Sequence, residues 1–358
     1  MSASDEYDHV KVVQQYGPGL HTNPASLETR MDPDWQRAQV FNFVDGAQLC
    51  EDLGFDGVTV TEHHGYMPSG SPHVMLAAAA MKTSHIRLGT AVTVLPLYSP
   101  IRVAEEAGLL DILSNGRFEL GVGRGSGEVQ FATANTMGPD EHNRRYAEGL
   151  ELLELALNQP EFTFDGQYYP VPTPLSITTR PVQKPLPVWI GAWSMGSVET
   201  AAEKGWGLMR NVGDAASHRA AVEHYIAHGR KHGRRLSGDN VMIERFVSIG
   251  ATRAEADANM DRSGARLSQL LQVLTAGGRW TPPGNAEHGV TTSGRPVLAM
   301  TGTPDTLIGD IRALLEETGA RQLMVAILDD DELRFFAKEV LPHIRKVKRA
   351  APEAHVAA

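Results

Sequence analysis

Short apolar runs rich in β-branched residues alternate with longer amphipathic segments along almost the whole chain. Such runs are typical of buried strands, whereas apolar residues that recur every three or four positions are typical of helices. The pattern predicts eight strands, at residues 9–13, 57–61, 86–95, 118–123, 187–192, 207–212, 241–250 and 322–328. It predicts nine helices, at residues 34–53, 72–82, 101–113, 143–157, 197–205, 215–232, 254–274, 304–319 and 331–347.

Strands that alternate with helices require parallel pairing and right-handed crossovers. Eight successive units predict an α/β fold, a closed (β/α)8 TIM barrel with insertions, and residues 1–358 are expected to form a single domain. Two insertions break the alternation, near residues 160–185 and 276–300. The first opens with a hairpin turn at Asp165 and Gly166. The second is rich in Gly and Pro without periodicity, which makes it a candidate lid.

Composition and charge narrow the class of protein. Hydrophobic residues make up 42% and charged residues 21% of the chain, the profile of a folded globular protein. The net charge of -10 is not that of a nucleic-acid binder, so nucleic acid is not an expected partner. No apolar run approaches the ~18 residues that cross a bilayer, so no membrane is expected either. A single cysteine, Cys50, and an N-terminus without signal-peptide features predict a cytoplasmic protein.

Two adjacent histidines follow the second predicted strand, in "TEHHGY" at residues 61–66. Alternation along the strand turns Val58 and Val60 toward the helices, so His63 should face the barrel mouth and His64 should point away. His63 is then either a hydrogen-bonded histidine at a strand end or an acid/base group. No metal site is predicted, because adjacent histidines diverge and neither an HExxH pattern nor a cysteine cluster supplies further ligands.

Three further motifs could contact a ligand. The glycine-rich run at residues 116–128 lets the backbone approach a ligand closely, and Arg124 beyond its strand could meet an anion, although Ser126 breaks the dinucleotide-binding spacing. Residues 192–197 lead from a strand into a helix, as in a phosphate site, or they contain a plain N-cap at Ser197. His142 and Tyr146 share a helix face, which either reaches a ligand or is solvated.

Together these segments resemble the bacterial luciferase-like family of flavin-dependent oxidoreductases. The resemblance runs in order over nearly the whole chain, through "GFDGVTVTEHH", "SPHVMLAAAAMKTSHIRLGTAVTVLPLYSPIRVAEEAGLLDILSNGRFELGVGRG", "EHNRRYAEGLELL", "PVWIGAWSMGSVETAAEKG" and "GTPDTLIGDIRALLEETG". It implies a (β/α)8 barrel that binds reduced FMN, or in another branch the deazaflavin F420, at the C-terminal mouth. It also implies that His63 is the catalytic acid/base group.

The resemblance implies a non-proline cis peptide at Ala91 and Val92, which forms a bulge against the flavin ring. The residues expected to bind the cofactor are Thr90, Ala91, Val92, Arg124, Ser126, His142, Tyr146, Ala192, Trp193, Ser194, Met195, Gly196 and Ser197. Bacterial luciferase has a glutamate where this chain has Trp193, which is a departure at the phosphate site. The segment at residues 102–113 resembles the helix of the family's dimer interface, with Glu105 and Glu106 at polar positions, so a homodimer is expected.

These expectations lead to a two-component monooxygenase. A separate flavin reductase supplies reduced FMN, which reacts with O2, and a small, apolar organic substrate is oxygenated. His63 manages protons, and the candidate lid at residues 276–300 excludes water. Two alternatives stay open: an F420-dependent hydride transfer, and a flavin-binding protein without catalysis. The identity of the substrate is not encoded in any of these motifs.

Overall fold

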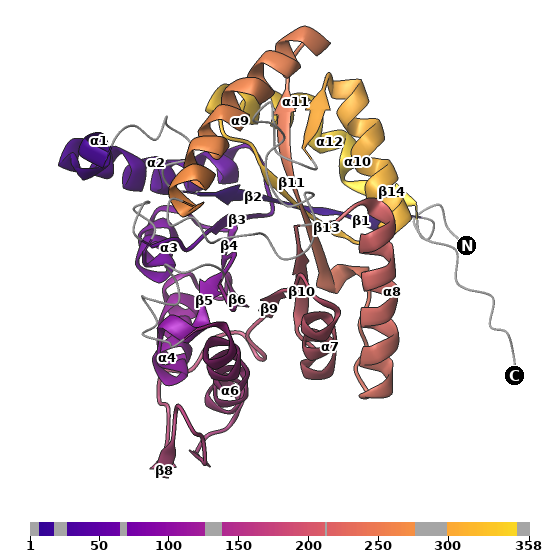
Figure 1. Cartoon of the computed structure of the whole chain (residues 1–358). Coiled ribbons are helices and arrows are strands. Elements are labelled where there is room, and N and C mark those ends of the chain that lie inside the picture. The colour runs from indigo at the N-terminus through magenta and orange to yellow at the C-terminus, as the bar shows by residue number, and fades with distance from the viewer. Residues whose placement is uncertain are drawn as a thin grey trace, which may run out of the picture.

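Eight parallel strands close into a barrel, and helices pack around it (Figure 1). The computed structural model describes residues 7–17, 27–64, 70–125, 138–211, 213–275 and 299–348. Around the barrel the strands are β2 (Lys11–Tyr16), β3 (Gly57–Val60), β4 (Arg87–Thr90), β6 (Phe118–Gly123), β9 (Val188–Gly191), β10 (Gly207–Arg210), β11 (Val241–Ile249) and β13 (Gln322–Ala326). The ring is closed because β13 pairs with β2 and β10 pairs with β11, all in parallel. The predicted TIM barrel is confirmed.

Eight of the nine predicted helices are present with small shifts at their ends, and the ninth is shorter than expected. They are α2 (Pro33–Asp52), α3 (Pro72–Lys82), α4 (Pro100–Leu113), α6 (Pro139–Asn158), α7 (Met195–Lys204), α8 (Ala215–Lys231), α9 (Arg253–Thr275), α10 (Pro304–Thr318) and α11 (Asp330–Glu339), and a short α1 (Leu27–Met31) precedes them. Gly205 and Gly319 are the C-caps of α7 and α10. Both have a positive φ, as a left-handed C-cap requires. Among the helices that the structure describes, each is too short or too polar to cross a lipid bilayer.

Two predictions at the ends of the chain are wrong in detail. The last helix was expected at residues 331–347, but α11 stops at Glu339 and is followed by α12 (Leu341–Ile344) and β14 (Lys346–Lys348). Pro342 explains the break, because proline lacks the N–H that would continue the helix and its ring clashes with the preceding turn. The predicted strand at residues 9–13 is likewise divided: β1 (Tyr7–His9) pairs antiparallel with β14, and β2 begins at Lys11.

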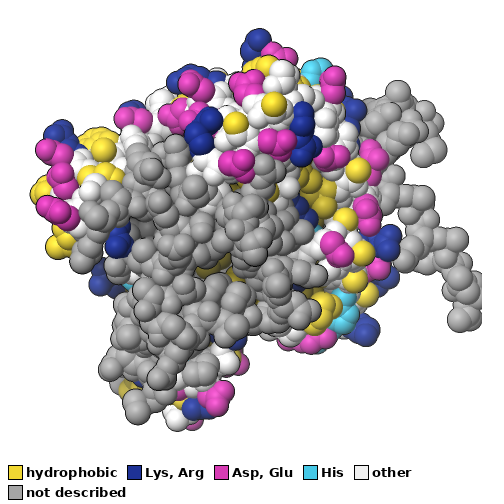
Figure 2. Space-filling view, turned by 45° about the horizontal axis from the view of Figure 1, so that its top comes forward, with side chains coloured by type: hydrophobic (Ala, Val, Ile, Leu, Met, Phe, Trp, Pro, Cys, Tyr) yellow, Lys and Arg dark blue, Asp and Glu magenta, His cyan; other side chains and the backbone are white. Residues whose placement is uncertain are grey.

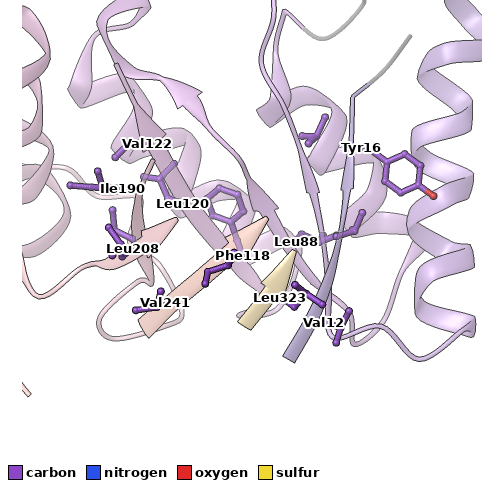
Figure 3. Close-up of a cluster of buried hydrophobic side chains, with 14 of the residues drawn as sticks. Val12, Tyr16, Leu88, Phe118, Leu120, Val122, Ile190, Leu208, Val241 and Leu323 are labelled. Carbon is purple, nitrogen blue, oxygen red and sulfur yellow. The ribbon is translucent and has the colours of Figure 1, made fainter. Parts of the chain in front are cut away.

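Alternate residues of each strand face opposite sides of the barrel wall. Figure 3 shows one side, on which strand residues such as Leu120 and Ile190 belong to the large apolar cluster that includes the helices. The other side faces the barrel interior, where a second cluster consists of Val13, Trp189, Met209, Met242 and Met324. The Thr59 hydroxyl lies 3.3 Å from the Met324 sulfur, so Thr59 faces the interior while Val58 and Val60 pack outward. The predicted orientation of this strand is confirmed.

The first predicted insertion contains a hairpin, formed by β7 (Phe162–Phe164) and β8 (Val171–Leu175). Its loop spans residues 165–170 and is therefore longer than the expected two-residue turn. The Glu148 carboxylate on α6 explains the longer loop, because it accepts hydrogen bonds from the N–H groups of Gln167, Tyr168 and Tyr169 at 2.7–2.9 Å. The second insertion falls mainly on residues 276–298, which lie outside the described residues, and β12 (Met300–Gly302) follows it.

Candidate functional site

The predicted acid/base residue, His63, lies just beyond the C-terminal end of β3. Alternation from the interior-facing Thr59 predicts that the side chain of His63 is directed to the barrel mouth. Burial and the neighbouring His64 lower the pKa of His63 to about 4. Its imidazole is therefore neutral near pH 7, with one ring nitrogen unprotonated.

Glu62, which separates β3 from His63, organises this end of the strand. Its side chain is fully buried. One carboxylate oxygen accepts from His64 Nε2 at 2.6 Å and from the Tyr98 hydroxyl at 2.7 Å, and the other accepts from the backbone N–H of Val94 at 2.7 Å. His64 is therefore bonded to the buried Glu62. No motif in the sequence indicated that Glu62 connects the end of β3 to the segment after β4.

That segment contains the expected bulge. The predicted strand at residues 86–95 is interrupted after Thr90, where the peptide bond Ala91-Val92 is cis as the resemblance implied, and β5 (Thr93–Val94) resumes the pairing with β6. The Ala91 N–H donates to the Val60 carbonyl at 3.0 Å, which places the bulge beside the strand that ends in His63. The Thr90 hydroxyl is buried and engaged by both backbone polar groups of Gly121, at 2.6 and 2.9 Å.

The glycines of β6 have a more specific role than close approach to a ligand. A Cβ on Gly123 would collide with the Val92 side chain, and one on Gly121 would collide with the Thr90 carbonyl. On the next strand, a Cβ on Gly191 would lie 3.2 Å from Val92. These glycines therefore leave the room that the bulge at residues 90–92 occupies inside the barrel.

Three of the predicted cofactor residues come together where β6 meets α6. Arg124 is exposed and donates through Nη1 to Asn143 Oδ1 at 2.8 Å, while His142 Nε2 lies 2.6 Å from the Arg124 carbonyl oxygen. The Tyr146 hydroxyl is buried and has no hydrogen-bond partner among the described residues. Burial raises the pKa of Tyr146 and lowers that of His142. A ligand with an oxygen acceptor at this position would satisfy the tyrosine. Ser126 lies outside the described residues.

The expected phosphate segment starts α7. Ser194, and not Ser197, is the N-cap: its hydroxyl accepts from the Ser197 N–H at 3.3 Å and lies 3.1 Å from the Ser197 hydroxyl. Trp193 and Met195 are 39% and 44% exposed, and a Cβ on Gly196 would meet nothing within 4 Å. The first N–H groups of a helix have no partner within it, so this open turn can receive an anion.

Ala192, by contrast, is buried, and its backbone is already engaged. Its N–H donates to the Met209 carbonyl at 2.9 Å, and its carbonyl accepts from Arg210 Nη1 at 3.2 Å. Because β6 and β9 are neighbours in the barrel, Arg124 and Trp193 follow adjacent strands. The arginine and the open helix turn therefore stand on the same part of the rim.

Glu244 carries an interior carboxyl group that was not among the predicted site residues. Glu244 lies two residues beyond Met242 on β11, so it faces the barrel interior one layer nearer to the mouth. It is 8% exposed, burial raises its pKa to about 7, and the Asn211 side chain, which follows β10, hydrogen bonds to it. The run "VMIERFVSIG" contained the signal, since a glutamate at an interior-facing position of a strand is rare unless it has a function or a partner.

The barrel and the polar groups at the C-terminal ends of its strands define a (β/α)8-barrel protein with its functional rim at that end. Residues 25–322 match the sequence model of the family described as luciferase-like monooxygenase, so the chain belongs to this family. The resemblance inferred from the motifs is confirmed.

Individual relatives show what this chain is similar to. The oxygenase component of a flavin-dependent trigonelline monooxygenase from Acinetobacter baylyi is 28% identical over 187 residues, which cover 50% of this chain and 50% of that protein. The oxygenating constituent of 3,6-diketocamphane monooxygenase from Pseudomonas putida, solved in complex with FMN, superposes with a TM-score of 0.75 at 18% identity, covering 95% of this chain and 100% of that one. Coenzyme F420-dependent tetrahydromethanopterin reductase from Methanopyrus kandleri superposes with a TM-score of 0.71 at 19% identity, covering 94% and 100%.

The extent of these matches differs. The chain spans about half the length of the first curated relatives that it matches, 48% and 47%. The two structural likenesses, at less than 20% identity, establish the fold.

Proposed function

We propose that this protein is the oxygenase of a two-component flavin monooxygenase, which takes reduced FMN from a separate flavin reductase and uses O2 to oxygenate a small, apolar organic substrate. The observation that carries the proposal is His63: a histidine at the mouth, beside the bulge, with its pKa lowered to about 4. Membership of the luciferase-like family and the likeness to an oxygenase component support it.

The described residues fit a flavin. The phosphate would lie on the first turn of α7 and near Arg124, the Tyr146 hydroxyl would donate to the cofactor, and the bulge at residues 90–92 would support the ring. When bound, the reduced flavin supplies the reaction with O2. The protein's own part is to hold the ring against the bulge and to accept or return a proton at a His63 ring nitrogen in a site shielded from water.

Two rival functions remain to be separated from this one. The likeness to an F420-dependent reductase keeps hydride transfer from F420 as the second candidate. A flavin-binding protein without catalysis is the third.

We also propose a homodimer formed through α3 and α4, because this surface exposes apolar side chains at Val74, Met81, Leu109, Ile112 and Leu113. We place the enzyme in the cytoplasm, where its buried Cys50, with a pKa raised to about 12, stays reduced.

An anaerobic titration followed by admission of air tests the proposal. Reduced FMN should bind more tightly than reduced F420, and with O2 the wild-type protein should delay the release of H2O2 relative to free reduced FMN. The variant His63→Asn should release H2O2 roughly 100-fold faster, since the proton management of a positioned histidine contributes about 10²–10⁴-fold. The matched control is His85→Asn, whose ring is 76% exposed beside Glu51 just before the start of β4 and should leave these kinetics unchanged.

Binding of reduced F420 alone would overturn the proposal in favour of hydride transfer. Tight binding of reduced FMN with H2O2 release as fast as in free solution would favour the protein without catalysis. If His63→Asn behaved as the wild type does, the assigned role of His63 would be wrong.

A further inference from the structure

Two histidines of α8 and the histidine at its C-cap face two glutamates on the neighbouring helix α7. His224, His228 and His232 are spaced four residues apart, as are Glu199 and Glu203, so each set lies along one side of its helix. Figure 2 shows histidine side chains gathered at the lower right of the molecule, the side on which Figure 1 draws α7 and α8. None of these five side chains is assigned a part in the proposed reaction.

The contacts pair the two helices at successive turns. His224 Nε2 lies 2.9 Å from a Glu199 carboxylate oxygen, and His228 Nε2 lies 2.9 Å from a carboxylate oxygen of Glu203. His232 Nε2 approaches the same Glu203 oxygen at 3.8 Å. The three imidazole rings stack nearly parallel, with centroids 5.6 and 4.8 Å apart. The nitrogens and oxygens therefore converge at one seam and do not point separately into solvent.

Two overlapping sets of three ligand atoms result. The ligand atoms of Glu199, His224 and His228 all lie within 4.8 Å of one another, and so do those of Glu203, His228 and His232. In a tetrahedral zinc site the ligand atoms lie roughly 3.3 Å apart, because metal–nitrogen distances are ~2.0–2.1 Å. The shared His228 is 17% exposed and the other four side chains are 38–49% exposed, so small side-chain rotations can close the remaining distance without moving the core.

We propose that α7 and α8 hold one divalent transition-metal ion of the zinc class, with His228 as the shared ligand and either Glu199 with His224 or Glu203 with His232 as its partners. Two imidazoles and a carboxylate suit Zn²⁺, Co²⁺ or Ni²⁺, whereas Ca²⁺ and Mg²⁺ prefer oxygen ligands. Three protein ligands leave a fourth position for water.

The neighbouring basic groups do not compete for this seam. Lys204 adjoins Glu203, but its ammonium group is held by Glu154 at 2.6 Å and lies over the Trp206 ring at 5.2 Å. Arg234 donates to the backbone carbonyl of Glu203 at 2.8 Å, which leaves the carboxylate to the histidines.

The expected consequence is a cross-link between two helices. Since the first turn of α7 carries Ser194 and Ser197, a bound ion would also stiffen the helix that presents the candidate phosphate turn. Metal binding itself does not depend on the proposed flavin chemistry, so each can fail without the other.

The test is a titration of the tag-free, chelator-treated full chain with ZnCl2 by calorimetry, and with CoCl2 by visible absorption. One equivalent should bind, the cobalt spectrum should show the intense bands of a tetrahedral site, and zinc should raise the thermal midpoint. His228→Gln should weaken binding at least ~100-fold and abolish the thermal shift, because it removes the shared ligand while keeping a hydrogen bond to Glu203.

His85→Gln is the matched control, because His85 also faces a carboxylate, that of Glu51 at 3.5 Å, but stands alone and is 76% exposed. It should bind zinc as the wild type does. Loss of affinity in His224→Gln or in His232→Gln assigns the ion to one of the two sets. Equal zinc affinity in His228→Gln and wild type, with both variants folded by circular dichroism, would overturn the proposal.

Discussion

Two parts of the rim are built in opposite ways. The first rim consists of residues 61–64 and 90–98, and its buried carboxylate, Glu62, accepts from three donors: His64 in its own segment, and Val94 and Tyr98 in the other. The second rim consists of residues 192–197 with Asn211 and Glu244. Its interior carboxyl, Glu244, has the Asn211 side chain as its hydrogen-bond partner and a pKa raised to about 7, and Trp193 and Met195 of the same rim are exposed.

The difference indicates that the first rim is a rigid support and that the second rim binds a ligand. A carboxylate with three donors fixes the backbone around it. The first rim is therefore a rigid surface, already hydrogen-bonded within the protein, against which a planar ring can pack. The second rim retains unsatisfied groups, namely the open first turn of α7 and the nearby Tyr146 hydroxyl. Such groups gain most when a ligand supplies their hydrogen bonds. We therefore expect the first rim to depend on Glu62 for stability and the second to depend on its ligand.

The largest expected effect is at Glu62. In Glu62→Gln the amide nitrogen would face a donor, and the charged acceptor of three hydrogen bonds would be lost in a fully buried position. Hydrogen bonds to buried charged groups contribute about 1.5–3 kcal/mol each, so we expect the free energy of unfolding to fall by about 3 kcal/mol. Urea denaturation followed by circular dichroism measures this change.

Glu317→Gln is the control for that experiment, because Glu317 is exposed on α10, outside the proposed dimer surface on α3 and α4. It should change the free energy of unfolding by less than about 0.5 kcal/mol. A similarly small effect of Glu62→Gln would show that the first rim is not organised by this carboxylate, and the comparison of the two rims would fail.

Glu244 should respond with the opposite sign. Its pKa is about 7 in the folded protein against 4.5 for an unperturbed glutamate, so the folded state binds more protons than the unfolded state between these values. Stability is therefore lost as the pH rises from 4.5 through 7. One unit of pKa corresponds to about 1.4 kcal/mol, and with water entry reducing the cost we expect Glu244→Gln to stabilise the protein by on the order of 2 kcal/mol at pH 8 and not at pH 4.

The measurement is the urea midpoint of wild type and Glu244→Gln at both pH values. Parallel pH dependence in the two proteins would mean that another group titrates in this window. Because Glu62→Gln is expected to destabilise at pH 8 and Glu244→Gln to stabilise, the pair of variants separates a carboxylate with three donors from one whose hydrogen-bond partner is the Asn211 side chain.

Much of the fold could be read from the sequence because it depends on local pattern. The β-branched runs and the helical periodicity gave the strands and helices in order, and alternation along β3 directed His63 to the mouth. Deviations arose where one residue overrides the pattern: Pro342 ends α11 early, and the Glu148 carboxylate enlarges the hairpin loop by binding three N–H groups. The latter contact joins residues about twenty positions apart, which periodicity does not detect.

The site was less accessible for the same reason. The family motifs pointed to His63, Arg124 and the first turn of α7, but the role of Glu62 depends on Val94 and Tyr98 from a different segment. The histidine spacing on α8 was visible in the sequence, whereas the facing glutamates of α7 become ligand candidates only after the two helices pack. The roles of these residues depend on contacts between segments, which the residue types alone do not predict.

The smallest effect is expected at the first turn of α7 and sharpens the account of the second rim. Ser194→Ala removes the N-cap and should lower the free energy of unfolding by ~1 kcal/mol, whereas Ser197→Ala, inside the helix, should lower it by less than about 0.5 kcal/mol. Both remove a hydroxyl from the candidate phosphate turn, so both should weaken binding of FMN several-fold and leave binding of riboflavin unchanged. Fluorescence titration with the two flavins gives this ratio.

Ser237→Ala is the control, because Ser237 caps the short helix η3 (Gly238–Asn240) at the opposite end of the barrel and should alter neither flavin affinity. If the serine variants weakened the binding of FMN and of riboflavin equally, the loss of affinity would come from a distorted helix and not from a missing phosphate contact. In that case Tyr146 and Arg124 would be the groups that bind the ligand beside the second rim.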